Sequence, residues 1–249
     1  MSEANIFGAK VKMRPPGELT AAERETGRRA MIDWNTRLLM GAIANAQASR
    51  YLFGLSVGQV MDFSALAILE EQQREQTSDP KVLHCRHLQR WTLRTPYEQI
   101  VTDTAKLLNR QEVRSEGRNI LAIDATGVGL PVVNLFKQAK INANIKPCLL
   151  TGGDEVTDEG EFTRIPKRDL VSTAQIAFQS GRLKIAEGLE HTQQLVSELT
   201  SFQTKVVLSA GPVETAWREG KNDDLVLAVM IALWESQRHK RELFSVGKV

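Results

Sequence analysis

The segment RNILAIDATGVGLPVVNLF, residues 118–136, indicates the fold class most clearly. Its apolar run Ile120-Leu-Ala-Ile123 is short and bounded by polar or turn residues, which predicts a buried strand. Gly127 and Gly129 predict a turn, and the residues from Pro131 to about Lys140 predict a helix. A buried strand that ends in an aspartate and continues through a turn into a helix is typical of an α/β protein.

The flanking segments extend this pattern in both directions. Upstream, two apolar runs around a glycine-containing turn predict a hairpin, and a third strand and a helix follow; the ranges are 51–57, 64–69, 81–91 and 97–108. Downstream, the expected elements are a strand at 145–150, an acidic loop or hairpin at 152–163, a helix at 167–179, a strand at 182–185, a helix at 189–202, a strand at 206–208 and a last helix from Asp223 to about 237. The order predicts a mixed central sheet flanked by helices.

The domain organisation follows from length and composition. The chain has 249 residues, of which 42% are hydrophobic and 25% charged, as in an ordinary globular protein. We expect an N-terminal arm or linker over 1–49, helical at about 21–48, one domain over 50–240 and a tail over 241–249. The net charge of +2 neither requires nor excludes a nucleic-acid partner.

The cysteines and the apolar runs exclude other classes of protein. Two cysteines rule out a disulfide scaffold and a four-cysteine zinc site. The longest apolar run, from Leu225 to Trp234, is far too short for a membrane span, and the N-terminus has no signal pattern. These features predict a soluble intracellular protein with no membrane partner.

Acidic residues stand at positions where an α/β protein builds a site. Asp124 ends the buried strand, Asp62 lies in the first hairpin turn, and Asp223 and Asp224 open an apolar helix. Each has an ordinary structural explanation, because acidic residues suit helix starts and turns. Carboxylates gathered without histidine or cysteine nevertheless favour Mg²⁺ or Mn²⁺ over zinc. His84 and His87 fall on opposite faces of their strand and are interpreted as structural.

At this point the sequence resembles a family, the nuclease domain of phage large terminase subunits. The resemblance covers about residues 50–238 and is carried by GLSVGQVMDFSALAILEE (54–71), LAIDATGVGLPVVNLF (121–136), RIPKRDLVSTAQIAFQSGRLKI (164–185) and AWREGKNDDLVLAVMIALW (216–234), in that order. It implies an RNase H-like fold, similar to Holliday-junction resolvases. It also implies a divalent-metal-dependent endonuclease that cuts concatemeric double-stranded DNA during packaging, in the cytoplasm of a bacterial host.

The resemblance assigns roles to individual residues. Asp124 and Asp224 would hold the first metal, and Asp62 and Asp223 would assist with a second metal or with the water. The family usually has an aspartate where this chain has Ser56, and a hydroxyl supplies no charge and binds a hard cation weakly. The DNA-binding candidates are basic residues of the second half: Arg164, Lys167, Arg168 and Lys184.

Two hypotheses therefore stay open. The first is a metal-dependent DNA endonuclease, favoured by Asp124 and the Asp223-Asp224 pair. The second is a catalytically weakened DNA-binding or assembly module of the same fold, favoured by Ser56. The chain has no phosphate-binding loop of the form GxxxxGK[ST], so a packaging ATPase would be a separate partner, alongside a small terminase subunit or a portal. A nucleotide-binding interpretation of the Asp124-Ala-Thr-Gly-Val-Gly string ranks lower.

Overall fold

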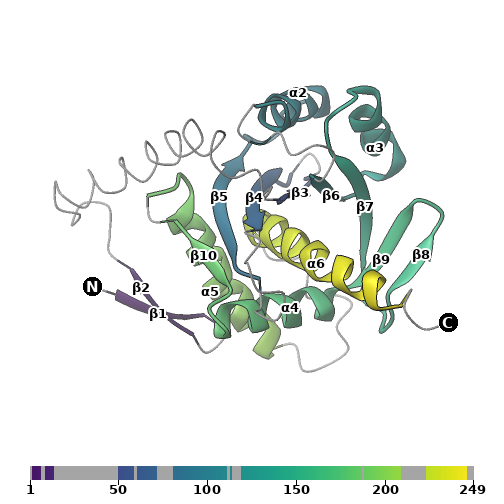
Figure 1. Ribbon diagram of the computed structural model, residues 1–249. Helices are drawn as coiled ribbons and strands as arrows, with labels where there is room; N and C mark the ends of the chain where they lie inside the picture. Colours follow the sequence, from purple (N-terminus) through teal and green to yellow (C-terminus); the bar gives the residue numbers. More distant parts are fainter. Residues whose placement is uncertain are drawn as a thin grey trace, which may run out of the picture.

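A mixed sheet of eight strands forms the centre of the molecule (Figure 1). The computed structural model describes residues 2–6, 9–13, 50–58, 61–71, 81–110, 113, 119–186, 188–208 and 223–245. The strand order is β10-β5-β4-β3-β6-β7-β9-β8. The strands are β3 (Arg50–Ser56), β4 (Ala65–Glu71), β5 (Leu83–Arg90), β6 (Ile120–Asp124), β7 (Asn144–Thr151), β8 (Thr157–Glu159), β9 (Phe162–Pro166) and β10 (Leu183–Ile185).

The strand directions bring the ends of most strands to one side of the sheet. β4 is antiparallel to β3 and to β5, and β8 is antiparallel to β9. The other pairings, β3 with β6, β6 with β7, β7 with β9 and β10 with β5, are parallel. Six strands therefore end at the same side of the sheet, which we call the carboxyl edge.

Helices cover both faces of the sheet. The helices are α2 (Tyr97–Leu108), α3 (Gly129–Gln138), α4 (Lys167–Gln179), α5 (Thr192–Leu208) and α6 (Asp224–Ser245). One core holds apolar side chains of α2 and α3 with Phe53, Leu55 and Ile123, and the other holds those of α4, α5 and α6 with Leu52 and Ala122. Because successive residues of a strand point to opposite faces, each central strand contributes to both cores. Figure 1 shows α2 and α3 together on one side, and α6 with α4 and α5 on the other.

The predicted mixed central sheet flanked by helices is confirmed. The predicted hairpin, the third strand and the helix predicted at 97–108 are present, and α4 has the predicted bounds. The acidic segment forms β8 and the start of β9, and β9 joins the main sheet beside β7. The predicted strand at 206–208 is wrong, because these residues continue α5 as far as Leu208. The β-branched Val206-Val207 pair favoured a strand, but strand propensity is a weak local preference that its context overrides.

The N-terminal arm is described only in its first strands. β1 (Ser2–Ile6) and β2 (Ala9–Met13) pair antiparallel as a separate two-stranded sheet. The helix expected at 21–48 lies outside the described residues.

Helix α6 crosses β3 at Gly54, which fixes its position on the sheet. A Cβ atom at Gly54 would lie 1.9 Å from the carbonyl oxygen of Ala228 and 3.0 Å from Cβ of Ala232. Only glycine permits such a close approach of helix to strand, since it has no Cβ. The start of α6 lies beyond this crossing, because Asp224 bonds to Arg90, the last residue of β5, at 3.1 Å. The helix therefore runs opposite to β3 and begins at the carboxyl edge.

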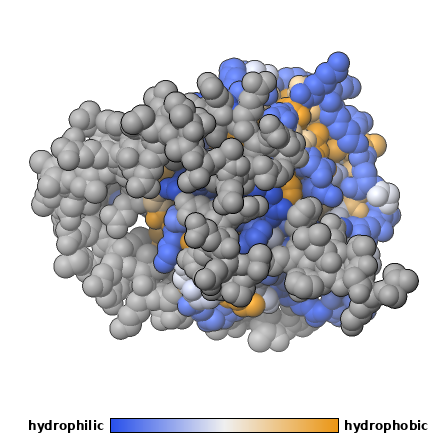
Figure 2. All heavy atoms as spheres, viewed as in Figure 1, coloured by the Kyte–Doolittle hydropathy of each residue, from blue (hydrophilic) through white to orange (hydrophobic). Residues whose placement is uncertain are grey.

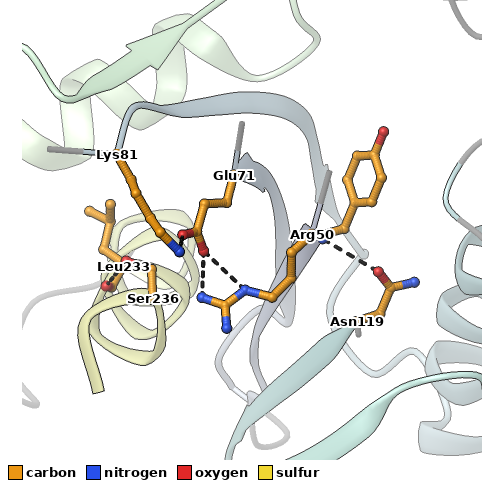
Figure 3. A network of polar contacts seen from close by, with 7 residues as sticks. Arg50, Glu71, Lys81, Asn119, Leu233 and Ser236 are labelled. Atoms are coloured by element: carbon orange, nitrogen blue, oxygen red, sulfur yellow. Dashed lines mark hydrogen bonds and ion pairs between the residues drawn. The ribbon is translucent and has the colours of Figure 1, made fainter. Parts of the chain in front are cut away.

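The end of the sheet opposite the carboxyl edge is held by a buried ion cluster. Nε of Arg50 donates to Oε2 of Glu71 at 3.0 Å, and Lys81 forms a second ion pair with the same carboxylate (Figure 3). Nearby, the backbone N–H of Tyr51 donates to Oδ1 of Asn119 at 3.4 Å. These contacts join β3, β4 and the approach to β5, which indicates a structural role for this end of the sheet.

The described surface has few large apolar side chains. The described residues visible in Figure 2 are mainly hydrophilic, with hydrophobic residues in small groups among them. The described part of the chain contains no helix long and apolar enough to cross a membrane.

Candidate active site at the carboxyl edge

One transverse row of residues crosses the sheet at its carboxyl edge. The backbone pairings place Arg90, Ala65, Ser56, Asp124 and Cys148 opposite one another on β5, β4, β3, β6 and β7. Paired residues point to the same face, and neighbouring strands are about 4.8 Å apart. Ala65 and Cys148 belong to the core beneath α6, so the whole row faces that helix. Ser56 and Asp124 are therefore immediate neighbours on the face that α6 covers.

The start of α6 lies over this row. Asp224 precedes Ala228 by four residues, about 6 Å along the helix. Ser56 follows Gly54 by two residues, about 6.6 Å along the strand in the matching direction. Since Ala228 sits on Gly54, Asp224 lies at the level of Ser56. The crossing of helix and strand thus brings together a carboxylate and a hydroxyl that are far apart in the sequence.

Arg90 confirms this placement through direct contacts. Its Nη2 donates to Oδ2 of Asp224 at 3.1 Å, and its Nη1 lies 3.9 Å from Oε1 of Glu198 on α5. The guanidinium carbon is 3.6 Å from the centroid of the Phe63 ring, a cation–π distance. Arg90, Asp224 and Glu198 are all buried at this point.

Burial raises the pKa of both carboxylic acids next to Arg90. The pKa of Asp224 is raised to about 6, chiefly by burial and further by the charges of Asp223 and Asp62, while Arg90 opposes the shift. The pKa of Glu198 is raised to about 7, again chiefly by burial. Glu198 also caps α6, because its Oε2 accepts the N–H groups of Leu225 at 3.0 Å and Val226 at 3.3 Å.

The turn between β3 and β4 holds Asp62 close to α6. A Cβ atom at Gly58 would lie 2.3 Å from the carbonyl oxygen of Phe63, so the turn is closed tightly. The Gly58 N–H donates to Oγ of Ser64 at 3.0 Å, which fixes the base of the turn. Asp62 is exposed, and its charge acts on Asp224. Asp62 therefore borders the site from the solvent side.

The Asp124 side chain is buried and hydrogen-bonded by the loop that follows it. Its Oδ1 accepts the N–H of Thr126 at 2.9 Å, and Oγ1 of Thr126 accepts the N–H of Leu150 at 2.8 Å. Gly127 and Gly129 adopt positive φ angles of 86° and 64°, which let the chain turn directly into α3. The loop sequence thus orients the carboxylate at the end of β6. Asp223 lies one residue before α6 and is half-buried.

The predicted DNA-binding residues are divided between the two ends of the sheet. Lys167 and Arg168 open α4 directly after Pro166, whose partner Thr151 ends β7 at the carboxyl edge. Arg168 pairs with Asp154. Arg164 is exposed on the face opposite Asp124 and pairs with Glu159.

Lys184 does not join this group. It pairs with His84 near the start of β5, six residues before Arg90, or about 20 Å along the strand. Lys184 is exposed on the edge strand β10, away from the carboxyl edge. Of the four candidates, Lys167 and Arg168 lie at the carboxyl edge, whereas Arg164 lies on the opposite face of the sheet from Asp124.

Sequence reasoning missed Arg90 and Glu198. Arg90 ends a strand, and Glu198 is an ordinary acidic residue of an amphipathic helix. The local sequence offers one signal, an arginine at the end of a half-apolar strand directly before Trp91. This pattern is too common to identify a site residue.

The prediction that His84 and His87 fall on opposite faces is wrong, because a β-bulge in the β4–β5 pairing sets them opposite Glu70 and Ile68, on one face of the sheet. Burial lowers the pKa of both histidines.

The donor chemistry of the row fits a hard cation. Asp124 and Asp224 supply carboxylate oxygens and Ser56 a hydroxyl, with no histidine or thiolate ligand, as Mg²⁺ and Mn²⁺ prefer. Among the described residues no group of three or more His, Cys, Asp or Glu side chains is close enough to hold a metal ion. A cation here would therefore use two carboxylates and complete its coordination with water or phosphate oxygens, which is common for Mg²⁺.

No protein-family model matches the sequence, and the comparison with curated proteins found no match. Among solved structures, the chain is similar to the large terminase nuclease of the thermophilic phage G20c with bound magnesium (18% identity, TM-score 0.48, covering 75% of this chain and 82% of that one). It is also similar to the HK97 bacteriophage large terminase (13%, 0.47, covering 89% and 51%). A third similar structure is the manganese-soaked human cytomegalovirus terminase nuclease domain (14%, 0.44, covering 81% and 92%). At these identities the similarity is one of fold.

Proposed function

We propose that residues 50–240 form a divalent-metal-dependent endonuclease that hydrolyses phosphodiester bonds of double-stranded DNA. The observation that supports this proposal is that Ser56 and Asp124 are paired neighbours at the carboxyl edge, and that α6, seated on Gly54, begins at the same edge with Asp224 bonded to Arg90. Clustered hard oxygen ligands in an α/β crevice suit phosphoryl chemistry.

Each acidic residue has a distinct part in the proposal. Asp124 and Asp224 hold Mg²⁺ or Mn²⁺, and Asp62 and Asp223 increase the negative charge around it. When bound, the cation would activate a water molecule and stabilise the leaving oxygen. Ser56 lies on β3 directly beside Asp124 and offers a neutral hydroxyl oxygen. The proposed ligand set therefore has one negative charge fewer than a set of three carboxylates.

Basic side chains at the same edge would bind the DNA backbone. Lys167 and Arg168 begin α4 two strands across the sheet from Asp124, four and five residues beyond Thr163, which is level with Asp124. The ion pair of Arg168 with Asp154 is exposed, and exposed pairs contribute little free energy, so a phosphate can displace the carboxylate. Such contacts are independent of sequence and weaken with salt.

A second function is favoured by one specific observation. Ser56 replaces a charge in the centre of the row, and Asp224 already has a cationic partner in Arg90. A catalytically weakened module that binds DNA, or assembles with a separate packaging ATPase, small terminase subunit or portal, would retain this arrangement. In both cases the protein would act on DNA inside a bacterial host.

Cleavage of a supercoiled plasmid in Mn²⁺ separates the two functions. We expect the wild-type chain to nick and linearise the plasmid and EDTA to stop the reaction. Asp124→Asn is the matched control, since its amide oxygen can still accept the Thr126 N–H while the charge is lost. An inactive wild type that still retards DNA in a gel would contradict the endonuclease and support the binding module.

A further inference from the structure

Arg90 joins three separate elements at the candidate active site. Its guanidinium contacts Asp224 at the start of α6, approaches Glu198 on α5 and stacks on Phe63 in the turn that carries Asp62. Only 9% of its side chain is exposed. The residue therefore links β5 to the start of α6, to α5 and to the turn between β3 and β4.

Only one oxygen of Asp224 is committed by this arrangement. Oδ2 accepts the hydrogen bond from Nη2 of Arg90, and the described residues make no hydrogen bond to Oδ1. A carboxylate that is held through one oxygen keeps its plane and direction while the second oxygen stays available to a ligand. This is the way protein groups around a metal site orient the ligands that touch the ion.

We propose that Arg90 is a positioning residue, which holds Asp224 through Oδ2 and so presents Oδ1 to the divalent cation. This inference rests on the proposed function, because the cation is the one that the endonuclease would use. Glu198 and Phe63 support Arg90, the former by facing Nη1 and the latter by fixing the plane of the guanidinium. Arg90 acts through Asp224 and has no contact of its own with the cation.

The planar fork of arginine is necessary for this role. Nη2 and Nη1 face two carboxylates from two neighbouring helices at once, at 3.1 Å from Asp224 on α6 and 3.9 Å from Glu198 on α5. A lysine ammonium is a single point charge and cannot repeat both contacts with the same geometry. Lysine at position 90 therefore keeps the charge and loses the orientation.

Arg50 provides a matched comparison within the same sheet. It is also a largely buried arginine paired with a buried carboxylate, Glu71, but at the opposite end of β3 (Figure 3). Arg50→Met and Arg90→Met remove the same group from similar surroundings. A general loss of stability affects both variants, whereas a loss of orientation at the site affects only the second.

Binding of Mn²⁺ alone tests the proposal, measured by the electron paramagnetic resonance signal of the free ion. We expect Arg90→Met and Arg90→Lys to weaken Mn²⁺ binding about 10-fold to 100-fold. Arg50→Met should stay within about twofold of wild type, which is small beside the effect of removing an orienting group. Arg90→Lys keeps the charge and supplies the test if Arg90→Met does not fold.

A double variant shows whether Arg90 acts through Asp224. If it does, Asp224→Asn and Asp224→Asn/Arg90→Lys bind Mn²⁺ equally, because the second change has nothing left to orient. A further weakening in the double variant, or wild-type affinity in Arg90→Lys, would overturn the positioning role while leaving the endonuclease intact. A wild type that binds no Mn²⁺ and cuts no DNA would overturn the proposed function, and the positioning role with it.

Discussion

Replacing Ser56 by aspartate would place a third charge in the row and test the site through stability. The new carboxylate would lie about 5 Å from that of Asp124, since β3 and β6 are neighbours in register at this point. At an effective dielectric constant of about 20, two like charges at this distance repel by about 3 kcal/mol. The positive charge of Arg90, two strands from position 56, offsets about half of this repulsion. The carboxylate of Asp224 would repel the new charge in addition to Asp124.

The expected net effect is a loss of about 3 kcal/mol of unfolding free energy in EDTA. The assay is thermal or denaturant unfolding of Ser56→Asp beside Ser56→Asn, which has the same shape without the charge. A difference of about 3 kcal/mol corresponds to a melting temperature lower by about 6–12 °C for a domain of this size. The neutral variant removes the effects of side-chain volume from the comparison.

Magnesium should reverse the loss. If the added carboxylate gives a dissociation constant of about 0.1 mM, then about 10 mM Mg²⁺ stabilises the folded state by about 2.7 kcal/mol. Ser56→Asn should gain much less from the same addition. Equal unfolding of the two variants in EDTA, or equal stabilisation by Mg²⁺, would show that Ser56 and Asp124 do not share one site.

Three further predictions concern packing, pH and the thiols. Gly54→Ala should lower the unfolding free energy by about 3 kcal/mol or more in a denaturant titration, because its Cβ would meet the carbonyl oxygen of Ala228 at 1.9 Å; a wild-type midpoint would refute the close approach of α6. The folded-state pKa of Glu198 is raised from 4.5 to about 7, so its contribution is fully present below pH 4.5 and is lost as the pH rises through about 7. Unfolding at several pH values should show a decline on the order of 3 kcal/mol that Glu198→Gln removes, and an unchanged slope in the variant would contradict this. Cys85 and Cys148 should not react with a thiol reagent at pH 8 until guanidinium is added, since burial raises the pKa of Cys85 to about 12 and that of Cys148 well above its ordinary value. Rapid reaction of the native protein would disprove the burial of at least one of them.

The sequence predicted most of the elements because their signals are local. Apolar runs bounded by turns identified β3, β4 and β6. The prediction failed where two local signals competed, as at Val206-Val207, and where β9 joined the sheet through pairing with distant β7. Strand pairing depends on residues far apart in the chain, which a local pattern does not describe.

For the site, the sequence by itself determined which residue types are present and where each stands on its own element. It identified Asp124 at a strand end, Asp224 at a helix start and Ser56 at the end of the first strand. Only the tertiary structure decided that Ser56, Asp124 and Arg90 share one row, that Lys184 lies elsewhere, and that Arg90 holds Asp224 across 134 positions of sequence. The physical reason is that side-chain periodicity is set by the local backbone, whereas strand register and the seating of α6 on Gly54 are set by packing between distant segments.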